Sequence, residues 1–354
     1  MSNIELDLAN QPILNGMVAE ASAGTGKTYS VAALLVRELA TDENLRIGEV
    51  MVTTFTRTAA AELRDRIRGA AISTCDQLRS RKANIEDVMA SHLLATFPND
   101  VDAMIRRLQR ALVEFDSATI STIHSVCTKV LHLAGVSLGG VGEEDITGRV
   151  VAEVVNDAIV SRAVAGVDIS RISPDRMAEV VAKLLADPFT EPWLDPSQNP
   201  FDETQPLSAE DQQFLDEYLQ MISECKDRVQ EATLNHPSFN DLLKRAHDVV
   251  TDSSRAALIE DIRSRFKLAI VDEAQDTDKL QWAFFDALFP RDQDDRALIA
   301  VGDPKQAIYG FRGADVHAFV LRIDPAKKRT LTTNHRSDKP VLSAAVQPGN
   351  RGIR

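Results

Sequence analysis

Eight consecutive residues near the N-terminus fit the phosphate-loop pattern, with alanine where the first glycine usually stands. These residues are Ala21, Ser22, Ala23, Gly24, Thr25, Gly26, Lys27 and Thr28. Gly24 and Gly26 allow the backbone to approach a phosphate group without a Cβ in the way. Lys27 supplies a positive charge for the outer phosphates, and the hydroxyl of Thr28 can bind Mg²⁺. The stretch therefore predicts a binding site for a nucleoside triphosphate with Mg²⁺.

Two carboxylates much later in the chain suit the hydrolysis of such a triphosphate. Asp272 and Glu273 directly follow an apolar segment, residues 268–271. Hydrolysis needs one carboxylate to orient Mg²⁺ and a second to orient or deprotonate the attacking water. Asp272 suits the first role and Glu273 the second. Acidic residues are common after strands, so the pair indicates this chemistry only in combination with the phosphate loop.

The segments around these motifs have the properties of a parallel sheet with helices. Residues 17–19, 50–55 and 268–271 are apolar, which is typical of short buried strands, whereas residues 31–39 and 56–67 have the spacing or composition of helices. Alternating strands and helices indicate a parallel sheet whose loops gather at the carboxyl ends of the strands. A helix N-terminus after the phosphate loop would add partial positive charge there. This context disfavours the alternative, an ordinary glycine turn.

Candidate nucleic-acid contacts follow two of the predicted strands. Phe55 could stack on a base, and Thr56 and Arg57 could hold phosphates. The alternative is equally consistent with the local pattern: Phe55 belongs to the core and the arginines face solvent. His124 has no second histidine or carboxylate at metal-ligand spacing, so by itself it indicates an ordinary buried or hydrogen-bonded histidine.

A glycine-rich loop after a further strand carries another set of candidates. Gln306 could sense the terminal phosphate, while Tyr309, Phe311 and Arg312 offer stacking faces and a cation suited to single-stranded bases. The aromatic residues could equally belong to the core. Arg336 could stabilise charge on the transferring phosphoryl group, although a lone arginine after a strand is more often a surface charge.

Length and composition predict two or three domains and no membrane span. The chain has 354 residues, 44% of them hydrophobic, and contains no run of about 18 apolar residues. Residues 1–11 lack the basic and then apolar pattern of a secretory signal. Cys75, Cys127 and Cys225 form no C-x-x-C pair and cannot fill an iron–sulfur cluster or a closed zinc site. We therefore expect a cytoplasmic protein.

The distribution of charge matters more than its sum. A net charge of −13 by itself argues against nucleic acid as a partner. The acids are concentrated at residues 191–231, however, whereas residues 57–68 contain four arginines. The acidic region belongs to a helical insert predicted at residues 131–240, with helix starts at Pro174 and Ser208. No catalytic pattern is visible in this insert, and we do not expect it to contact nucleic acid.

Six stretches, in this order, resemble the motifs of the UvrD/Rep-type DNA helicases of superfamily one. They read AEASAGTGKT, TTFTRTAAAELRDRI, STIHSVC, VDEAQDT, GDPKQAIYGFRGAD and LTTNHRS. The first and fifth are most similar to the RecB branch, and residues 239–243 resemble its FDDLL segment. Departures are His335, where the family usually has tyrosine or tryptophan, and Ser125, where glycine is common. The chain is therefore identified as a member of this family.

The resemblance implies an α/β fold in two parts. A RecA-like phosphate-loop NTPase domain with a parallel sheet, domain 1A, would occupy residues 1–130 and 241–354. A mostly helical insert, domain 1B, would occupy residues 131–240. The second RecA-like domain and the nuclease domain of RecB-like chains are expected to be absent from these residues.

The resemblance also implies a role for each candidate residue in the nucleotide site. Lys27 and Thr28 would bind phosphate and Mg²⁺, and Tyr29 would pack on the adenine. Asp272 would bind Mg²⁺, and Glu273 would be the catalytic base.

Further implied roles concern coupling and DNA. Gln275 and Gln306 would couple the γ-phosphate to DNA, and Arg336 would be an arginine finger. The residues implied to lie along single-stranded DNA are Phe55, Thr56, Arg57, His124, Tyr309, Phe311 and Arg312.

The implied activity is that of an ATP-dependent helicase that moves 3′ to 5′ along single-stranded DNA during double-strand break repair and recombination. ATP and Mg²⁺ would be its cofactors, and other subunits of a RecBCD-like complex, exonuclease V, its partners. Without a second motor domain we expect these 354 residues to hydrolyse ATP poorly. One alternative is a truncated, non-catalytic module that binds DNA or a helicase partner. Another is a fragment of a UvrD- or AddA-type repair helicase.

Overall fold

The computed structural model divides the chain into two compact units. One contains residues 1–126 and 250–354, and the other residues 127–249. The structure describes residues 5–10, 13, 15–22, 25–83, 88–136, 147–186, 208–233, 238–291, 293, 295–307, 319–320, 324 and 326–331.

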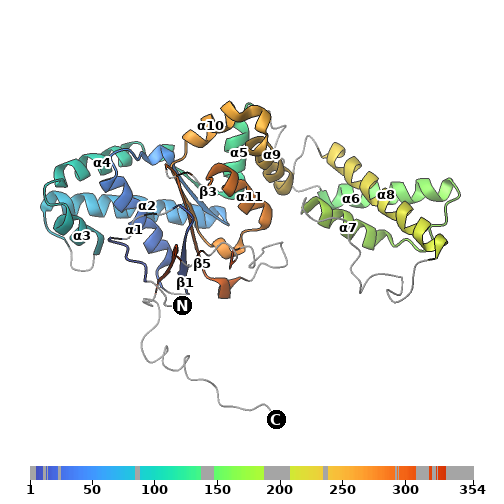
Figure 1. Cartoon of the computed structure of the whole chain (residues 1–354), viewed down its shortest axis with the longest axis horizontal. Helices are drawn as coiled ribbons and strands as arrows, with labels where there is room; N and C mark the ends of the chain where they lie inside the picture. The colour runs from blue at the N-terminus through green and yellow to red at the C-terminus, as the bar shows by residue number, and fades with distance from the viewer. Residues whose placement is uncertain are drawn as a thin grey trace, which may run out of the picture. The chain divides into compact units, whose positions relative to one another are not determined.

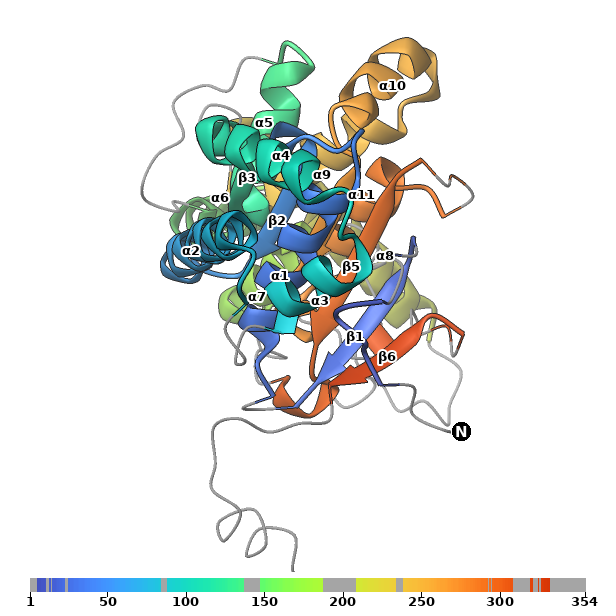
Figure 2. The ribbon, with the colours of Figure 1, turned by 90° about the vertical axis from the view of Figure 1, so that its left-hand side faces the viewer.

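The first unit, hereafter the α/β unit, is built on a parallel sheet. Its strands in the described residues have the order β3-β2-β4-β5-β1-β6, and every pairing is parallel (Figures 1 and 2). The strands are β1 (Met17–Ala21), β2 (Val50–Thr54), β3 (Thr119–Thr122), β4 (Leu268–Val271), β5 (Ala297–Gly302) and β6 (Lys328–Leu331). The parallel sheet predicted from the sequence is therefore confirmed.

Helices connect these strands and cover the sheet. Those that lie wholly within the α/β unit are α1 (Lys27–Thr41), α2 (Arg57–Ser80), α3 (Val88–Thr96), α4 (Val101–Val113), α10 (Ala256–Ser264) and α11 (Lys279–Leu288). Two more helices cross the boundary between the units in sequence, namely α5 (Ile123–Leu133) and α9 (Phe239–Thr251).

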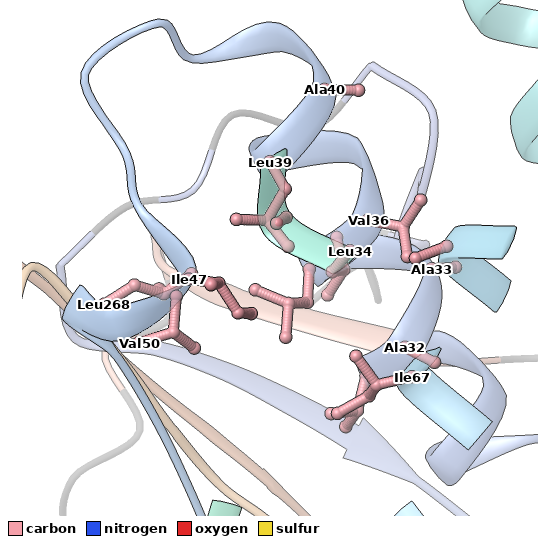
Figure 3. Close-up of a cluster of buried hydrophobic side chains, with 14 of the residues drawn as sticks. Ala32, Ala33, Leu34, Val36, Leu39, Ala40, Ile47, Val50, Ile67 and Leu268 are labelled. Carbon is pink, nitrogen blue, oxygen red and sulfur yellow. The ribbon is translucent and has the colours of Figure 1, made fainter. Parts of the chain in front are cut away.

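The main core of the α/β unit lies between the sheet and the helices α1, α2 and α4. All residues of β2 and β4 are buried, as expected for strands covered on both faces. Figure 3 shows Leu34 and Leu39 of α1 beside Ile67 of α2 and, from the sheet side, Val50 and Leu268. Removal of these side chains from water is the main favourable term that holds the strands in register. The core thereby fixes where each strand ends and each functional loop begins.

The second unit, hereafter the helical unit, has a core of its own. Its helices α6 (Thr147–Val164), α7 (Pro174–Ala186) and α8 (Ala209–Ala232) pack side by side (Figure 1). The buried residues between them include Val155, Met177 and Met221. The helix starts predicted at Pro174 and Ser208 are confirmed, because Pro174 is the first residue of α7 and the Ser208 hydroxyl accepts the N–H of Asp211 at 3.1 Å.

Candidate functional site

The phosphate loop leaves β1 at Ala21 and enters α1 at Lys27. Within its described part, the carbonyl oxygen of Ser22 accepts the Thr25 N–H at 3.2 Å and the Thr25 hydroxyl at 2.7 Å. Gly26 has a φ of 81°, a left-handed conformation that glycine adopts without a steric penalty. The chain therefore turns from strand to helix within a few residues.

The first turn of α1 presents backbone N–H groups that have no acceptor within the helix. The first helical hydrogen bond runs from the Ser30 N–H to the Gly26 carbonyl oxygen at 2.8 Å. The N–H groups of Lys27, Thr28 and Tyr29 precede it, and an α-helix has no internal acceptor for donors in its first turn. Together they carry the partial positive charge of the helix N-terminus, which stabilises an anion. The side chain of Thr28 is half-buried, and Tyr29 is exposed.

Lys27 joins the phosphate loop to the ends of two other strands. Its Nζ lies 2.6 Å from Glu273 Oε2, in the turn after β4. The same Nζ lies 3.5 Å from Gln306 Oε1, in the 3₁₀ helix η6 (Pro304–Gln306) after β5. Because β4, β5 and β1 are neighbours, their carboxyl ends meet at one edge of the sheet. The structure thus brings together three predicted catalytic residues from distant parts of the sequence.

Gln275 extends these contacts, and Asp303 closes them into a ring. The Gln275 amide belongs to the 3₁₀ helix η5 (Ala274–Asp276) and donates to Glu273 Oε2 at 2.9 Å. Its Oε1 accepts the backbone N–H of Asp303 at 2.9 Å, and Asp303 Oδ2 accepts from Gln306 Nε2 at 2.6 Å. We call Lys27, Glu273, Gln275, Asp303 and Gln306 the five-residue ring. It links the phosphate loop to the turns after β4 and β5.

Burial and mutual repulsion disfavour the ionised forms of the carboxylates near the five-residue ring. Burial, together with the negative charge of Glu273, raises the pKa of Asp272 to about 6. The N–H of Glu273, which donates to Asp272 Oδ1 at 3.0 Å, and the charge of Lys27 oppose this rise. Burial and Glu273 also raise the pKa of Asp276. The site therefore holds more negative charge than Lys27 neutralises, and a divalent cation would relieve the excess.

The described candidates for DNA contact lie at the ends of two adjacent strands, β2 and β3. Phe55 is half-buried directly after β2, and Arg57 is an exposed residue at the start of α2. The hydroxyl of Thr56 accepts the Ala59 N–H at 3.1 Å, so it caps α2. His124 is half-buried at the start of α5. Burial lowers its pKa, which leaves the imidazole of His124 uncharged at neutral pH.

Several predicted site residues cannot be placed in this arrangement, because they lie outside the described residues. They are Ala23, Gly24, Tyr309, Phe311, Arg312 and Arg336.

Sequence reasoning missed Asp303 and Asp276. Asp303 had a local signal, because aspartate before Pro304 is typical of a cap, and its Oδ1 accepts the Lys305 N–H at 3.0 Å. Asp276 had none, because no sequence pattern indicates that its side chain contacts Gln275. Gln275 Nε2 donates to Asp276 Oδ2 at 3.2 Å.

Two negative findings apply to the described part of the chain. It contains no group of three or more His, Cys, Asp or Glu side chains that could hold a metal ion by themselves. It also contains no helix that is both long enough and apolar enough to cross a membrane. Cys75, Cys127 and Cys225 are buried and belong to no disulfide.

A parallel sheet whose strand ends join a phosphate-loop lysine to an Asp-Glu pair defines a phosphate-loop nucleotide-binding protein. The family model described as UvrD/REP helicase N-terminal domain matches residues 3–326. The chain therefore belongs to the UvrD/REP helicase family, and the family predicted from the motifs is confirmed.

Two groups of curated relatives are similar to this chain. The RecBCD enzyme subunit RecB of Mycobacterium tuberculosis H37Rv is 34% identical over 332 residues, which are 92% of this chain and 29% of the relative. RecB of Escherichia coli K12 is 26% identical over 451 residues, covering 94% of this chain and 38% of the relative. The ATP-dependent DNA helicase UvrD1 of M. tuberculosis H37Rv is 26% identical over 341 residues, covering 92% and 36%. The chain thus spans less than half the length of these relatives.

Proposed function

We propose that these residues form the N-terminal ATP-binding motor domain of a RecB-like DNA helicase that moves 3′ to 5′ along single-stranded DNA. The observation that carries the proposal is the five-residue ring, in which Lys27 contacts Glu273 at 2.6 Å and Gln306 at 3.5 Å. The identity of 34% to a RecB, against 26% to UvrD1 over the same 92% share of this chain, favours the RecB branch over the UvrD type. Double-strand break repair and recombination is the process that this assignment proposes.

The side chains present fit ATP and Mg²⁺, which membership of the family implies. Asp272 is a carboxyl group that its surroundings make costly to ionise, and a cation beside it would reverse that cost. Lys27 would bind the outer phosphates, while the Thr28 hydroxyl and Asp272 would hold Mg²⁺. When bound, Mg²⁺ would neutralise charge on the phosphates and polarise the terminal phosphoryl group. Tyr29 would pack on the adenine.

The remaining roles concern proton transfer and coupling. Glu273 would accept a proton from the attacking water. Gln275 and Gln306 would report the state of the γ-phosphate to the DNA-binding segments, because both belong to the ring and to the turns after neighbouring strands. Arg336 would stabilise charge on the transferring phosphoryl group.

We assign the proposed domains to the two units. The α/β unit would be domain 1A and the helical unit domain 1B. Single-stranded DNA would follow the ends of β2 and β3 and the loop after β5. The proposed contacts are Phe55, Thr56, Arg57, His124, Tyr309, Phe311 and Arg312. Further proposals are a cytoplasmic location and partner subunits of a RecBCD-like complex.

Nucleotide binding by the 354-residue chain tests this proposal directly. A fluorescent, non-hydrolysable ATP analogue with Mg²⁺ should bind the wild-type chain, and Lys27→Ala should weaken binding by about tenfold or more, since it removes a charge from the phosphate site. Glu273→Gln should keep the affinity and reduce hydrolysis by about 10²–10⁴-fold. Lys183→Ala, on the exposed surface of α7, is the matched control and should change neither quantity.

Two outcomes would contradict parts of the proposal. Equal affinity of Lys27→Ala and the wild type for the ATP analogue would contradict a phosphate site at Lys27. Slow hydrolysis by the wild-type chain is expected, because an arginine finger is typically worth about 10³–10⁵ in rate and a second motor domain normally supplies one of them. Rapid, DNA-stimulated hydrolysis that Lys27→Ala abolishes would instead establish that these residues are sufficient for catalysis.

A further inference from the structure

Gln275 is the member of the five-residue ring whose amide uses its oxygen and both of its N–H groups in hydrogen bonds. The residue is 2% exposed. Its Oε1 accepts from the Asp303 N–H at 2.9 Å, and its Nε2 donates to Glu273 Oε2 at 2.9 Å and to Asp276 Oδ2 at 3.2 Å. A primary amide has only two N–H donors, so Asp276 takes the one that Glu273 does not. A rotated amide would place an oxygen against two carboxylates.

The surroundings of Asp276 do little to stabilise its ionised carboxylate. The residue is 7% exposed, and Oδ1 has no hydrogen-bond partner among the described residues. Burial and the negative charge of Glu273 both disfavour its ionised form and raise its pKa. Buried polar atoms without partners are rare in native structures and call for an explanation. The hydrogen bond that Asp276 accepts from Gln275 is the contact that explains why a carboxylate is buried here.

Gly302, the last residue of β5, provides the space into which Gln275 fits. A Cβ at this position would lie 2.6 Å from Gln275 Oε1 and 3.1 Å from the Gln275 backbone nitrogen. Carbon and oxygen atoms do not approach to 2.6 Å without bonding, so any larger residue would displace the amide. The need for glycine here is therefore a matter of space.

We propose that Asp276 and Gly302 are positioning residues that act through Gln275: Asp276 fixes the orientation of its amide, and Gly302 leaves room for it. The result is a constant hydrogen bond to Glu273 Oε2. This inference rests on the proposed function, in which Lys27 contacts phosphates when the nucleotide is bound. The contact between Lys27 and Glu273 is then weaker, and the hydrogen bond from Gln275 keeps the Glu273 carboxylate oriented.

The first test needs no nucleotide. In the ¹⁵N-labelled wild-type chain, the two side-chain N–H signals of Gln275, assigned by their loss in Gln275→Leu, should exchange slowly with water. Asp276→Ala should accelerate this exchange by about tenfold or more, because one N–H loses its acceptor. Asp276→Asn retains an oxygen acceptor and should remain close to the wild type. Asp76→Ala, which removes an exposed carboxylate from α2, is the matched control.

The second test measures hydrolysis and stability together. Asp276→Ala should lower kcat about tenfold and leave the KM for ATP unchanged, and Asp276→Asn should restore most of the rate. The Tm of Asp276→Ala at pH 7.5 should stay close to that of the wild type, because removal of a carboxylate that the fold disfavours offsets the hydrogen bond that Gln275 loses. Gly302→Ala should lower kcat similarly, and most of its effect should vanish in the Gln275→Ala background.

The outcomes separate this inference from the proposed function. Unchanged Gln275 exchange in Asp276→Ala, or a loss of kcat that merely follows a lower Tm, would overturn the positioning role. Additive effects of Gly302→Ala and Gln275→Ala would do the same for Gly302. Absence of nucleotide binding by the wild type would instead overturn the proposed function, and the exchange experiment would still decide the inference.

Discussion

At the scale of single residues, the backbone of Glu273 is the most informative feature. It has φ 51° and ψ 43°, in the left-handed region, which is unfavourable by about 1–2 kcal/mol for a residue with a Cβ. The other non-glycine example in the described chain is Arg81, at the end of α2, where helices commonly end in this conformation. Glu273 instead reverses the chain directly after Asp272, which turns its carboxylate back to Lys27. Strain is thus located at the proposed catalytic base.

This strain predicts an unusual order of stabilities. Glu273→Gly and Glu273→Ala both remove the carboxylate, but only glycine adopts the left-handed conformation freely. We expect the glycine variant to be more stable than the alanine variant by about 1 kcal/mol, measured by urea denaturation without nucleotide. Elsewhere in a chain the order is normally reversed, because glycine loses more conformational entropy on folding. A more stable alanine variant would show that the turn relaxes when the carboxylate is absent.

Part of the site could be predicted from residue types in the sequence. The rest became visible only from distances in the structure. Lys27, Asp272 and Glu273 could be predicted because each stands in a local pattern that serves one chemistry. Asp276 and Gly302 could not, because their roles depend on Gln275 lying between β4 and β5. Gly302 is 27 positions from Gln275 in sequence, and nothing in the pattern of either segment predicts their contact.

At the scale of elements, the capping of α2 qualifies the prediction for Thr56. The sequence makes Thr56 one candidate for a DNA phosphate contact, and the structure shows its hydroxyl accepting the Ala59 N–H at 3.1 Å. The two roles are compatible, because a hydroxyl can still donate its hydrogen while it accepts another. The three strand ranges predicted from apolar runs agree with β1, β2 and β4 to within two residues, whereas the helices extend further than predicted, as α2 does in reaching Ser80. Such ends depend on caps and turns of this kind.

Substitutions at Thr56 can separate the two roles. Thr56→Ala should lower the free energy of unfolding by about 1 kcal/mol, because α2 loses its cap. Thr56→Asp restores a capping oxygen and should return stability to the wild-type value, yet its negative charge should weaken binding of single-stranded DNA. Denaturant unfolding and DNA titrations at two salt concentrations measure both effects. If Thr56→Asp binds DNA as well as the wild type at low salt, DNA does not pass this helix end.

At the scale of the whole molecule, each unit has a core of its own, and the proposed nucleotide site lies entirely in the α/β unit. Leu34 is 1% exposed in the core of the α/β unit, and Met221 is 2% exposed in the core of the helical unit. Residues 127–249 interrupt the α/β unit in sequence. The boundaries depend on which contacts form across the chain, so local patterns could not define them.

Separate cores predict that nucleotide stabilises one unit selectively. In differential scanning calorimetry, a non-hydrolysable ATP analogue at about 100 times its Kd should stabilise the α/β unit by about 2.7 kcal/mol and raise only its transition. Met221→Ala should lower the transition of the helical unit, by about 2–5 kcal/mol in stability, and leave nucleotide affinity at 20 °C unchanged. Leu34→Ala should lower the other transition, which identifies each one independently of the ligand. A single transition that nucleotide and both substitutions shift alike would mean that the two cores unfold as one cooperative structure, in which case a change in the helical unit would reach the nucleotide site through global stability.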